Sequence, residues 1–384
     1  MTSKERMLAA FRNQVPDTTP VAPDISNMIP CRLTGRPFWD VYLHQNPPLW
    51  RAYLDAVRYY QMDGWVTYGY IGLKTHGDQR RWSIDLVSRT EARIVVRTTC
   101  STPDGDLWSE MTYYRADPPT QTRKWIKSFE EDFPKLRHFF PRMVGYDPEP
   151  LWEMMRETGD LGVVGAGPVV PGMQNLFDWF DGGLEAVVYA YVDHYDKLRE
   201  FVHWQERQAA VVTDMVLDAK PDFLMLGASG LWTMQSPSIF RDLSLPTLKM
   251  ATKKAKQAGI PSFLHSCGRQ RDQVKVLVEE TDLDVVNPLE PPPMGDCDLA
   301  EIKRLYGHRI ALMGNLHTTD VMLRGTPELV AAESLRAIEA AGVNGGFVLS
   351  TGDQCGRDTP DDNIRAMVRA AREYGPPPRC YAGH

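Results

Sequence analysis

Residue types that bind metals occur at three points where the chain leaves a predicted strand: His265 with Cys267, then Glu290, then Cys355. Residues two apart on a strand face the same side, so the imidazole of His265 and the thiol of Cys267 can converge. A histidine and a cysteine at one strand end are more often simply packed. Two thiolates, one imidazole and one carboxylate together, however, suit tetrahedral zinc. The joint pattern therefore predicts a zinc site formed by His265, Cys267, Glu290 and Cys355, with the carboxylate as the most exchangeable ligand.

Eight short apolar segments are predicted to be the strands that position these residues. Most are continuously apolar, which is typical of buried parallel strands. Helical patterns separate them, and one of these opens at Thr326 before a first-turn proline. Strands that alternate with helices predict an α/β fold, a (β/α)₈ TIM barrel, with an open doubly wound sheet as the alternative. The eight segments are 19–25, 63–70, 161–167, 222–228, 261–267, 284–290, 309–315 and 346–351.

One stretch interrupts this alternation. From 79 to 120 apolar and polar residues alternate, and Pro-Asp-Gly-Asp forms a turn between two such runs. We predict an antiparallel β insertion, about 76–125, after the second strand. We expect a single barrel domain over 1–384 that ends in a flexible tail, 376–384. Active sites of such barrels lie at the C-terminal ends of the strands, which is where the candidate ligands occur.

Composition excludes several classes of protein. The chain has 384 residues, of which 43% are apolar and 24% charged, as in an ordinary globular protein. No apolar run approaches the roughly 20 residues of a membrane helix, and the charged start lacks a secretory signal. A net charge of −7 gives no basic footprint for nucleic acid. We expect a cytoplasmic protein with reduced thiols and with no nucleic-acid or membrane partner; a homodimer is compatible with the sequence.

The candidate ligands resemble, in type and order, the zinc ligands of cobalamin-independent methionine synthase. More closely, nearly the whole chain resembles the uroporphyrinogen decarboxylase superfamily, in its cobalamin-dependent methyltransferase branch. The resemblance lies in the opening Ser-Lys-Glu-Arg-Met at 3–7, in the block 313–363, and above all in His-x-Cys-Gly and Cys-Gly-x-x-Thr-Pro. It implies the same barrel, a zinc ion, and cobalamin carried by a partner corrinoid protein.

Two directions of methyl transfer occur within that branch. Some members methylate a thiol from a corrinoid protein, and others demethylate a methoxylated aromatic. The turn 351–358 resembles the second group, the methyltransferase I component of O-demethylase systems. We therefore predict a zinc-dependent enzyme that transfers methyl from a methoxylated aromatic to cobalt(I) of a partner corrinoid protein. Methylcobamide:thiol methyl transfer is the alternative.

Two further alternatives are weaker. A decarboxylase is disfavoured because the arginine-rich N-terminal loop of true uroporphyrinogen decarboxylase is not found around Arg32 and Arg36. In a non-catalytic barrel, zinc would only hold strand ends together, and such a site would have four protein ligands and no open position.

Other residues at predicted strand ends are candidates for the substrate pocket. Asp353 is predicted as a proton donor or as a hydrogen-bond partner of His265, with His317 as the second candidate donor. Aromatic and methionine side chains suit a flat ring, although ordinary loop packing is the alternative for each. The predicted substrate-binding residues are Asp24, Asn27, Tyr68, Tyr70, Met173, Asn175, Trp179, Trp232 and Asn315.

Overall fold

The computed structural model describes residues 1–377, so the last seven positions of the predicted tail lie outside the described residues. At its centre is a parallel sheet with the strand order β1-β8-β9-β10-β11-β12-β13. Each of these strands overlaps one of the predicted segments. They are β1 (Gly64–Gly69), β8 (Gly162–Ala166), β9 (Phe223–Gly227), β10 (Ser262–His265), β11 (Val285–Asn287), β12 (Ala311–Leu316) and β13 (Phe347–Thr351).

The predicted first strand, 19–25, occupies the remaining position in the ring. Val21 forms a parallel bridge with Leu349 of β13, and the N–H of Ala22 donates to the carbonyl of Leu349 at 2.9 Å. On its other side, the N–H of Asp63 donates to the carbonyl of Val21 at 2.9 Å, directly before β1. The segment therefore lies between the two outer strands of the sheet and closes it, which confirms the predicted barrel-like fold.

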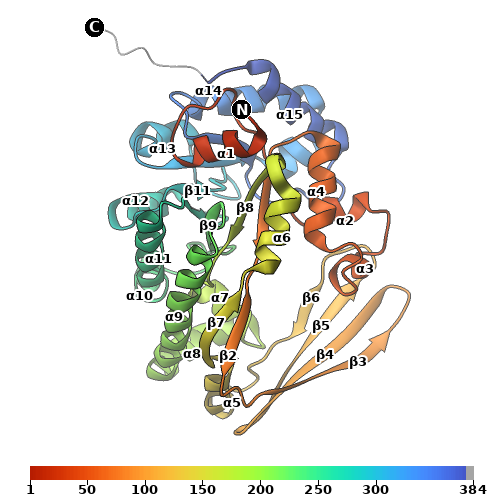
Figure 1. Cartoon of the computed structure of the whole chain (residues 1–384), viewed down its shortest axis with the longest axis vertical. Coiled ribbons are helices and arrows are strands. Elements are labelled where there is room, and N and C mark those ends of the chain that lie inside the picture. Colours follow the sequence, from red (N-terminus) through yellow and green to blue (C-terminus); the bar gives the residue numbers. More distant parts are fainter. Residues whose placement is uncertain (378–384) are drawn as a thin grey trace.

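Helices connect the strands and surround them (Figure 1). Two begin with a side-chain cap: Ser236 accepts from the N–H of Ile239, and Thr326, at the predicted helix start, accepts from that of Leu329, both at 3.3 Å. Residues 237–258 form two helices rather than one, because the helix is interrupted at Ser244. The helices are α1 (Ser3–Phe11), α2 (Met28–Leu33), α3 (Phe38–Tyr42), α4 (Leu49–Tyr60), α5 (Phe129–Leu136), α6 (Glu149–Thr158), α7 (Met173–Phe177), α8 (Gly183–Asp193), α9 (Tyr195–Asp218), α10 (Pro237–Leu243), α11 (Leu245–Ala258), α12 (Arg271–Glu280), α13 (Leu299–Tyr306), α14 (Pro327–Ala341) and α15 (Asp361–Tyr374).

The strands are apolar on both faces because each face is buried against a different layer. Phe263 and Val285 belong to a cluster that fills the barrel and includes Phe11 of α1. Their sequence neighbours Leu264 and Val286 belong instead to the cluster between the strands and the outer helices. Since side chains alternate along a strand, the residues two positions after Phe263 and Val285 also point into the barrel, at its C-terminal end.

The predicted insertion is confirmed as an antiparallel sheet beside the barrel, in the lower right of Figure 1. Its strands are β3 (Arg81–Arg89), β4 (Arg93–Thr102), β5 (Gly105–Tyr114) and β6 (Thr120–Arg123), with the predicted turn between β4 and β5. A further antiparallel pair, β2 (Gly72–His76) with β7 (Arg142–Asp147), joins this region to the barrel. Among residues 1–377, no helix is both long and apolar enough to cross a membrane.

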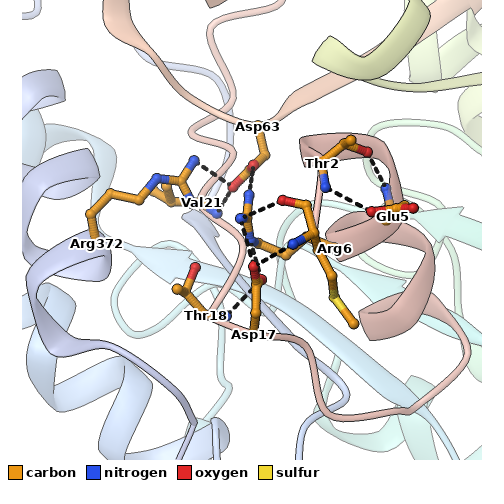
Figure 2. Close-up of polar contacts among 9 residues, drawn as sticks. Thr2, Glu5, Arg6, Asp17, Thr18, Val21, Asp63 and Arg372 are labelled. Atoms are coloured by element: carbon orange, nitrogen blue, oxygen red, sulfur yellow. Dashed lines mark hydrogen bonds and ion pairs between the residues drawn. The ribbon is translucent and has the colours of Figure 1, made fainter.

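A buried carboxylate joins the two ends of the chain (Figure 2). Asp63 is fully buried, and its Oδ1 lies 2.9 Å from Nη1 of Arg6 on α1. Its Oδ2 lies 3.0 Å from Nη2 of Arg372 on α15 and accepts from the N–H of Val21 at 2.8 Å. Arg6 also pairs with Asp17 at 2.8 Å, nearer the surface. One side chain therefore holds α1, the first-strand segment, β1 and α15 together.

Candidate metal centre

Three metal-binding side chains converge at the C-terminal end of the barrel. Each of His265, Cys267 and Asp353 offers one ligand atom, and these atoms lie within 4.8 Å of one another. His265 ends β10, Cys267 follows it, and Asp353 follows β13. The Nε2 atom of His265 lies 4.0 Å from Oδ1 of Asp353. Imidazole, thiolate and carboxylate are all zinc ligands, so this donor set fits the predicted metal.

The turn after β10 brings backbone and side chain together at this group. Gly268, the residue after Cys267, has a φ of +90°, and a Cβ there would lie 2.2 Å from Oγ1 of Thr233. Only glycine fits both requirements without strain. The N–H of Gly268 donates to Oε1 of Glu290 at 2.6 Å. The turn that carries Cys267 is thereby tied to the loop after β11.

The charge of His265 depends on its polar neighbours. Burial alone would lower its pKa, but a hydrogen bond with Cys267, the carboxylates of Asp353 and Asp24, and a hydrogen bond with Asn287 raise that pKa to about 9. The metal-free imidazole is therefore protonated at neutral pH. A proton must leave its Nε2 before a metal ion can bind there.

This raised pKa predicts the pH dependence of the metal-free protein. A histidine whose pKa rises on folding stabilises the folded state fully below its unfolded pKa of about 6.5, and that contribution is lost as pH rises through about 9. We expect the free energy of unfolding of wild type, relative to His265→Gln, to fall between about pH 6.5 and pH 9, by a few kcal/mol at most. Urea unfolding of both chelator-treated proteins across that range measures the difference. A difference that does not change with pH would contradict the prediction.

The other two predicted ligands lie nearby but outside this group of three. Glu290 is buried, and burial raises its pKa; the charges of His265 and Asp353 act on it. Cys355 is also buried, and burial raises the pKa of its thiol to about 12. Its backbone N–H donates to the carbonyl of Asp24 at 2.8 Å. The four-ligand set remains a prediction, and the structure adds Asp353 as a further donor.

Two predicted substrate residues, one in the first-strand segment and one just after it, lie beside the loop that follows β13. Asp24 is buried, and its Oδ1 accepts from Oγ and from the N–H of Ser26, at 2.6 and 3.0 Å. Burial raises the pKa of this carboxyl. Asn27 donates from Nδ2 to Gln354 at 3.4 Å. Asp24 is therefore positioned close enough to His265 for the two charges to influence each other.

The remaining predicted substrate residues have more varied surroundings. The ring of Tyr68 packs against Tyr53 at 5.9 Å, and burial raises the pKa of its phenol well above the usual value. Tyr70 is 58% exposed. Trp232 packs against Phe240 at 5.0 Å. Met173, Asn175 and Trp179 lie in and just after α7, which follows β8. Met173 belongs to the apolar cluster that includes Leu107 and Phe129, and Trp179 packs against it. The Oδ1 atom of Asn175 is buried without a hydrogen bond.

Asn315 and His317 lie at the end of β12, between the strands that precede Glu290 and Asp353. The Nδ1 atom of His317 accepts the N–H groups of Thr319 and Asp320, at 3.2 and 3.0 Å, and so caps the turn that follows. Asn315 donates from Nδ2 to the carbonyl of Leu289 at 2.9 Å. Both residues line a cavity of about 440 Å³ beside α13 and α14. A proton-donor role for His317 stays a prediction.

Comparisons with known proteins identify similar proteins of two kinds. The model of the uroporphyrinogen decarboxylase (URO-D) family matches residues 185–374. A methylated-thiol–coenzyme M methyltransferase from Methanosarcina mazei is 26% identical over 207 residues, 53% of this chain and 49% of that protein. A methylcobamide:CoM methyltransferase from Methanosarcina barkeri is 29% identical over 141 residues, 37% of this chain and 38% of that one. A uroporphyrinogen decarboxylase from Azoarcus is 33% identical over 86 residues, 22% and 24% of the two chains.

Among solved structures, a methyltransferase from Methanosarcina mazei superimposes with a TM-score of 0.65. The match covers 97% of this chain and 99% of that one, at 18% sequence identity, and so concerns the fold. In the sequence comparisons, the chain spans about half or less of the length of these curated relatives. The residues that the family model matches, 185–374, include β10, β11 and β13, the strands that carry the candidate metal centre.

Proposed function

We propose that this chain, which belongs to the uroporphyrinogen decarboxylase superfamily, is a zinc-dependent methyltransferase acting between a corrinoid on a partner protein and the sulfur of a small thiol. The observation that carries the proposal is the convergence of His265, Cys267 and Asp353 at the barrel mouth. The names of two relatives, a methylated-thiol–coenzyme M and a methylcobamide:CoM methyltransferase, support this chemistry.

The proposal assigns the metal to the three converging residues, with Glu290 and Cys355 as the further predicted ligands. Bound zinc would act as a Lewis acid that keeps a thiol sulfur deprotonated and nucleophilic near neutral pH. Residues of the chain provide the shape of this site. Gly268 allows the close turn after Cys267, and its N–H orients the carboxylate of Glu290.

The reaction balances with one proton acceptor. In methylation of the thiol, the S–H proton leaves, a bond forms between sulfur and the methyl carbon, and the carbon–cobalt bond breaks with both electrons remaining on cobalt. We assign the proton to Glu290, which would act as the base when it is not bound to the metal; it is the most exchangeable of the predicted ligands, and burial raises its pKa, which makes its carboxylate a stronger base. The reverse reaction, from a methylated thiol to cobalt(I), uses the same groups in the opposite order.

O-demethylation is the finer prediction made from the turn 351–358, and it stands as the second candidate. It shares the barrel, the metal and the corrinoid partner, and it differs in taking methyl from an aryl ether oxygen. The relatives with methyltransferase names act on sulfur compounds by those names, which is why we rank the thiol first.

The two candidates are distinguished by one set of assays on the full zinc-loaded chain. We expect methylcob(III)alamin to be demethylated in the presence of 2-mercaptoethanesulfonate or another small thiol, with the thioether as product and with no turnover in metal-free protein. Absorbance follows the cobalamin, and mass spectrometry identifies the product. Turnover only with cob(I)alamin and methoxylated aromatics would show that the enzyme is an O-demethylase rather than a thiol methyltransferase. Decarboxylation of a porphyrinogen without metal would overturn both.

A further inference from the structure

We propose that Asn287 is the positioning residue that fixes the ring orientation and the tautomer of His265. The inference rests on the proposed metal centre. His265 and Asn287 are partners in the parallel pairing of β10 with β11, so their side chains lie level and point into the barrel together. The Nδ1 atom of His265 lies 2.7 Å from Oδ1 of Asn287.

The amide of Asn287 can face His265 in only one way. Its other end lies 3.3 Å from the backbone carbonyl of Met313 on β12, and a carbonyl only accepts hydrogen bonds. The end facing Met313 is therefore the NH₂ group, and the end facing His265 is the oxygen. An oxygen there requires a proton on Nδ1 of His265. Because Nδ1 is engaged by Asn287, the other ring nitrogen of His265, Nε2, faces the candidate metal ligands and lies 4.0 Å from Oδ1 of Asp353.

The position of Asn287 is itself held from several sides. The residue is fully buried. Its backbone carbonyl accepts from the N–H of Ser266 at 2.9 Å and from Nε2 of Gln270 at 3.0 Å. Gln270 is also fully buried, and its Oε1 accepts from the N–H of Leu289 at 2.7 Å. The turn that carries Cys267 and the loop that carries Glu290 are thus both tied to the residue that orients His265.

A histidine that binds metal through one nitrogen usually donates its other N–H to a fixed acceptor, and loss of that acceptor typically weakens metal binding 10- to 100-fold. We expect Asn287→Leu to weaken zinc binding by about that factor, measured by competition with a chromophoric chelator. Asn287→Asp, which keeps an acceptor for Nδ1–H, should recover much of the affinity. In cobalt(II)-substituted protein, Asn287→Leu should also change the ligand-field spectrum, because the imidazole ligand is misplaced.

Asn363 on α15 provides the matched control. It is likewise buried, and its Nδ2 donates to the carbonyls of Met322 and Gly325 at 2.8 and 2.9 Å. Asn363→Leu should cost stability without changing zinc affinity. Equal zinc affinity in wild type and Asn287→Leu would overturn the inference while leaving the metal centre intact. Absence of zinc binding by wild type would instead remove the proposed metal centre.

A second measurement covers the case in which Asn287→Leu does not fold. Nitrogen-15 NMR of the zinc-loaded wild type reports which ring nitrogen of His265 carries a proton. We expect the proton on Nδ1. A proton on Nε2, with Nδ1 on the metal, would overturn the inference without any substitution.

Discussion

Replacing Cys267 by alanine is expected to reduce bound zinc from about one ion per chain to a small fraction and to reduce methyl transfer to background, while the barrel stays folded. The thiolate is the strongest zinc ligand in the converging group, and alanine offers no donor atom. The side chain lies in the turn after β10 and is partly exposed, outside the apolar clusters. Metal analysis by mass spectrometry, methyl-transfer assays and circular dichroism measure the three expected results.

Cys31→Ala is the matched control for this variant. Cys31 is a fully buried cysteine of α2, in a small apolar cluster with Phe38 and Val41. Its replacement should cost stability but leave the zinc content unchanged. A Cys267→Ala protein that retains one zinc ion and full activity would contradict the proposed centre. Global unfolding of Cys267→Ala, or of chelator-treated wild type, would favour a metal that only holds strand ends together.

Cobalt(II) spectroscopy of Cys355→Ala decides between the predicted four-ligand set and the group formed by His265, Cys267 and Asp353. If Cys355 binds the metal, cobalt(II)-substituted wild type should lose part of its sulfur-to-metal charge-transfer absorption in this variant. If Asp353 is the third ligand, as its distance to His265 and Cys267 favours, the absorption should persist in Cys355→Ala and the affinity should fall in Asp353→Asn.

Sequence alone was sufficient for the barrel because each strand is buried on two faces. Phe263 packs inside the barrel and Leu264 outside it, so the segment is apolar throughout and easily recognised. The pairing of β2 with β7 was not predicted, because its partners are far apart in sequence and mostly exposed. Pairings of that kind depend on how the insertion packs, which no local pattern encodes.

The candidate site was predicted less completely, for a physical reason. Strand residues alternate regularly, so His265 could be assigned to the barrel mouth. The turn after β13 has no such period. Alternation therefore cannot decide which of Asp353, Gln354 and Cys355 points toward the site. Asp353, predicted as a partner of His265, lies within the donor group, whereas Cys355 lies outside it. Asn287 was overlooked, although its place level with His265 on the next predicted strand was a usable signal.

The largest expected effect on stability belongs to the ion cluster of Figure 2. Asp63→Asn removes the charge that both Arg6 and Arg372 approach, and Arg6 is only 11% exposed. Breaking a buried ion pair by removing one partner typically costs about 3–5 kcal/mol, because the remaining charge stays buried without compensation. We expect a loss of that order in the free energy of unfolding, measured with urea on metal-free protein.

Asp17→Asn tests the same arginine from its solvent side. Asp17 is 38% exposed and lies 2.8 Å from Nε of Arg6, but Asp63 would still compensate the guanidinium in this variant. The expected loss is therefore about 1 kcal/mol or less, as for other exposed pairs. Equal losses in the free energy of unfolding in the two variants would show that the burial of Asp63 does not determine how much the ion cluster stabilises the fold. A large loss confined to Asp63→Asn would mean that closure of the barrel between the first-strand segment and β1 depends on this one carboxylate, at the end opposite the metal centre.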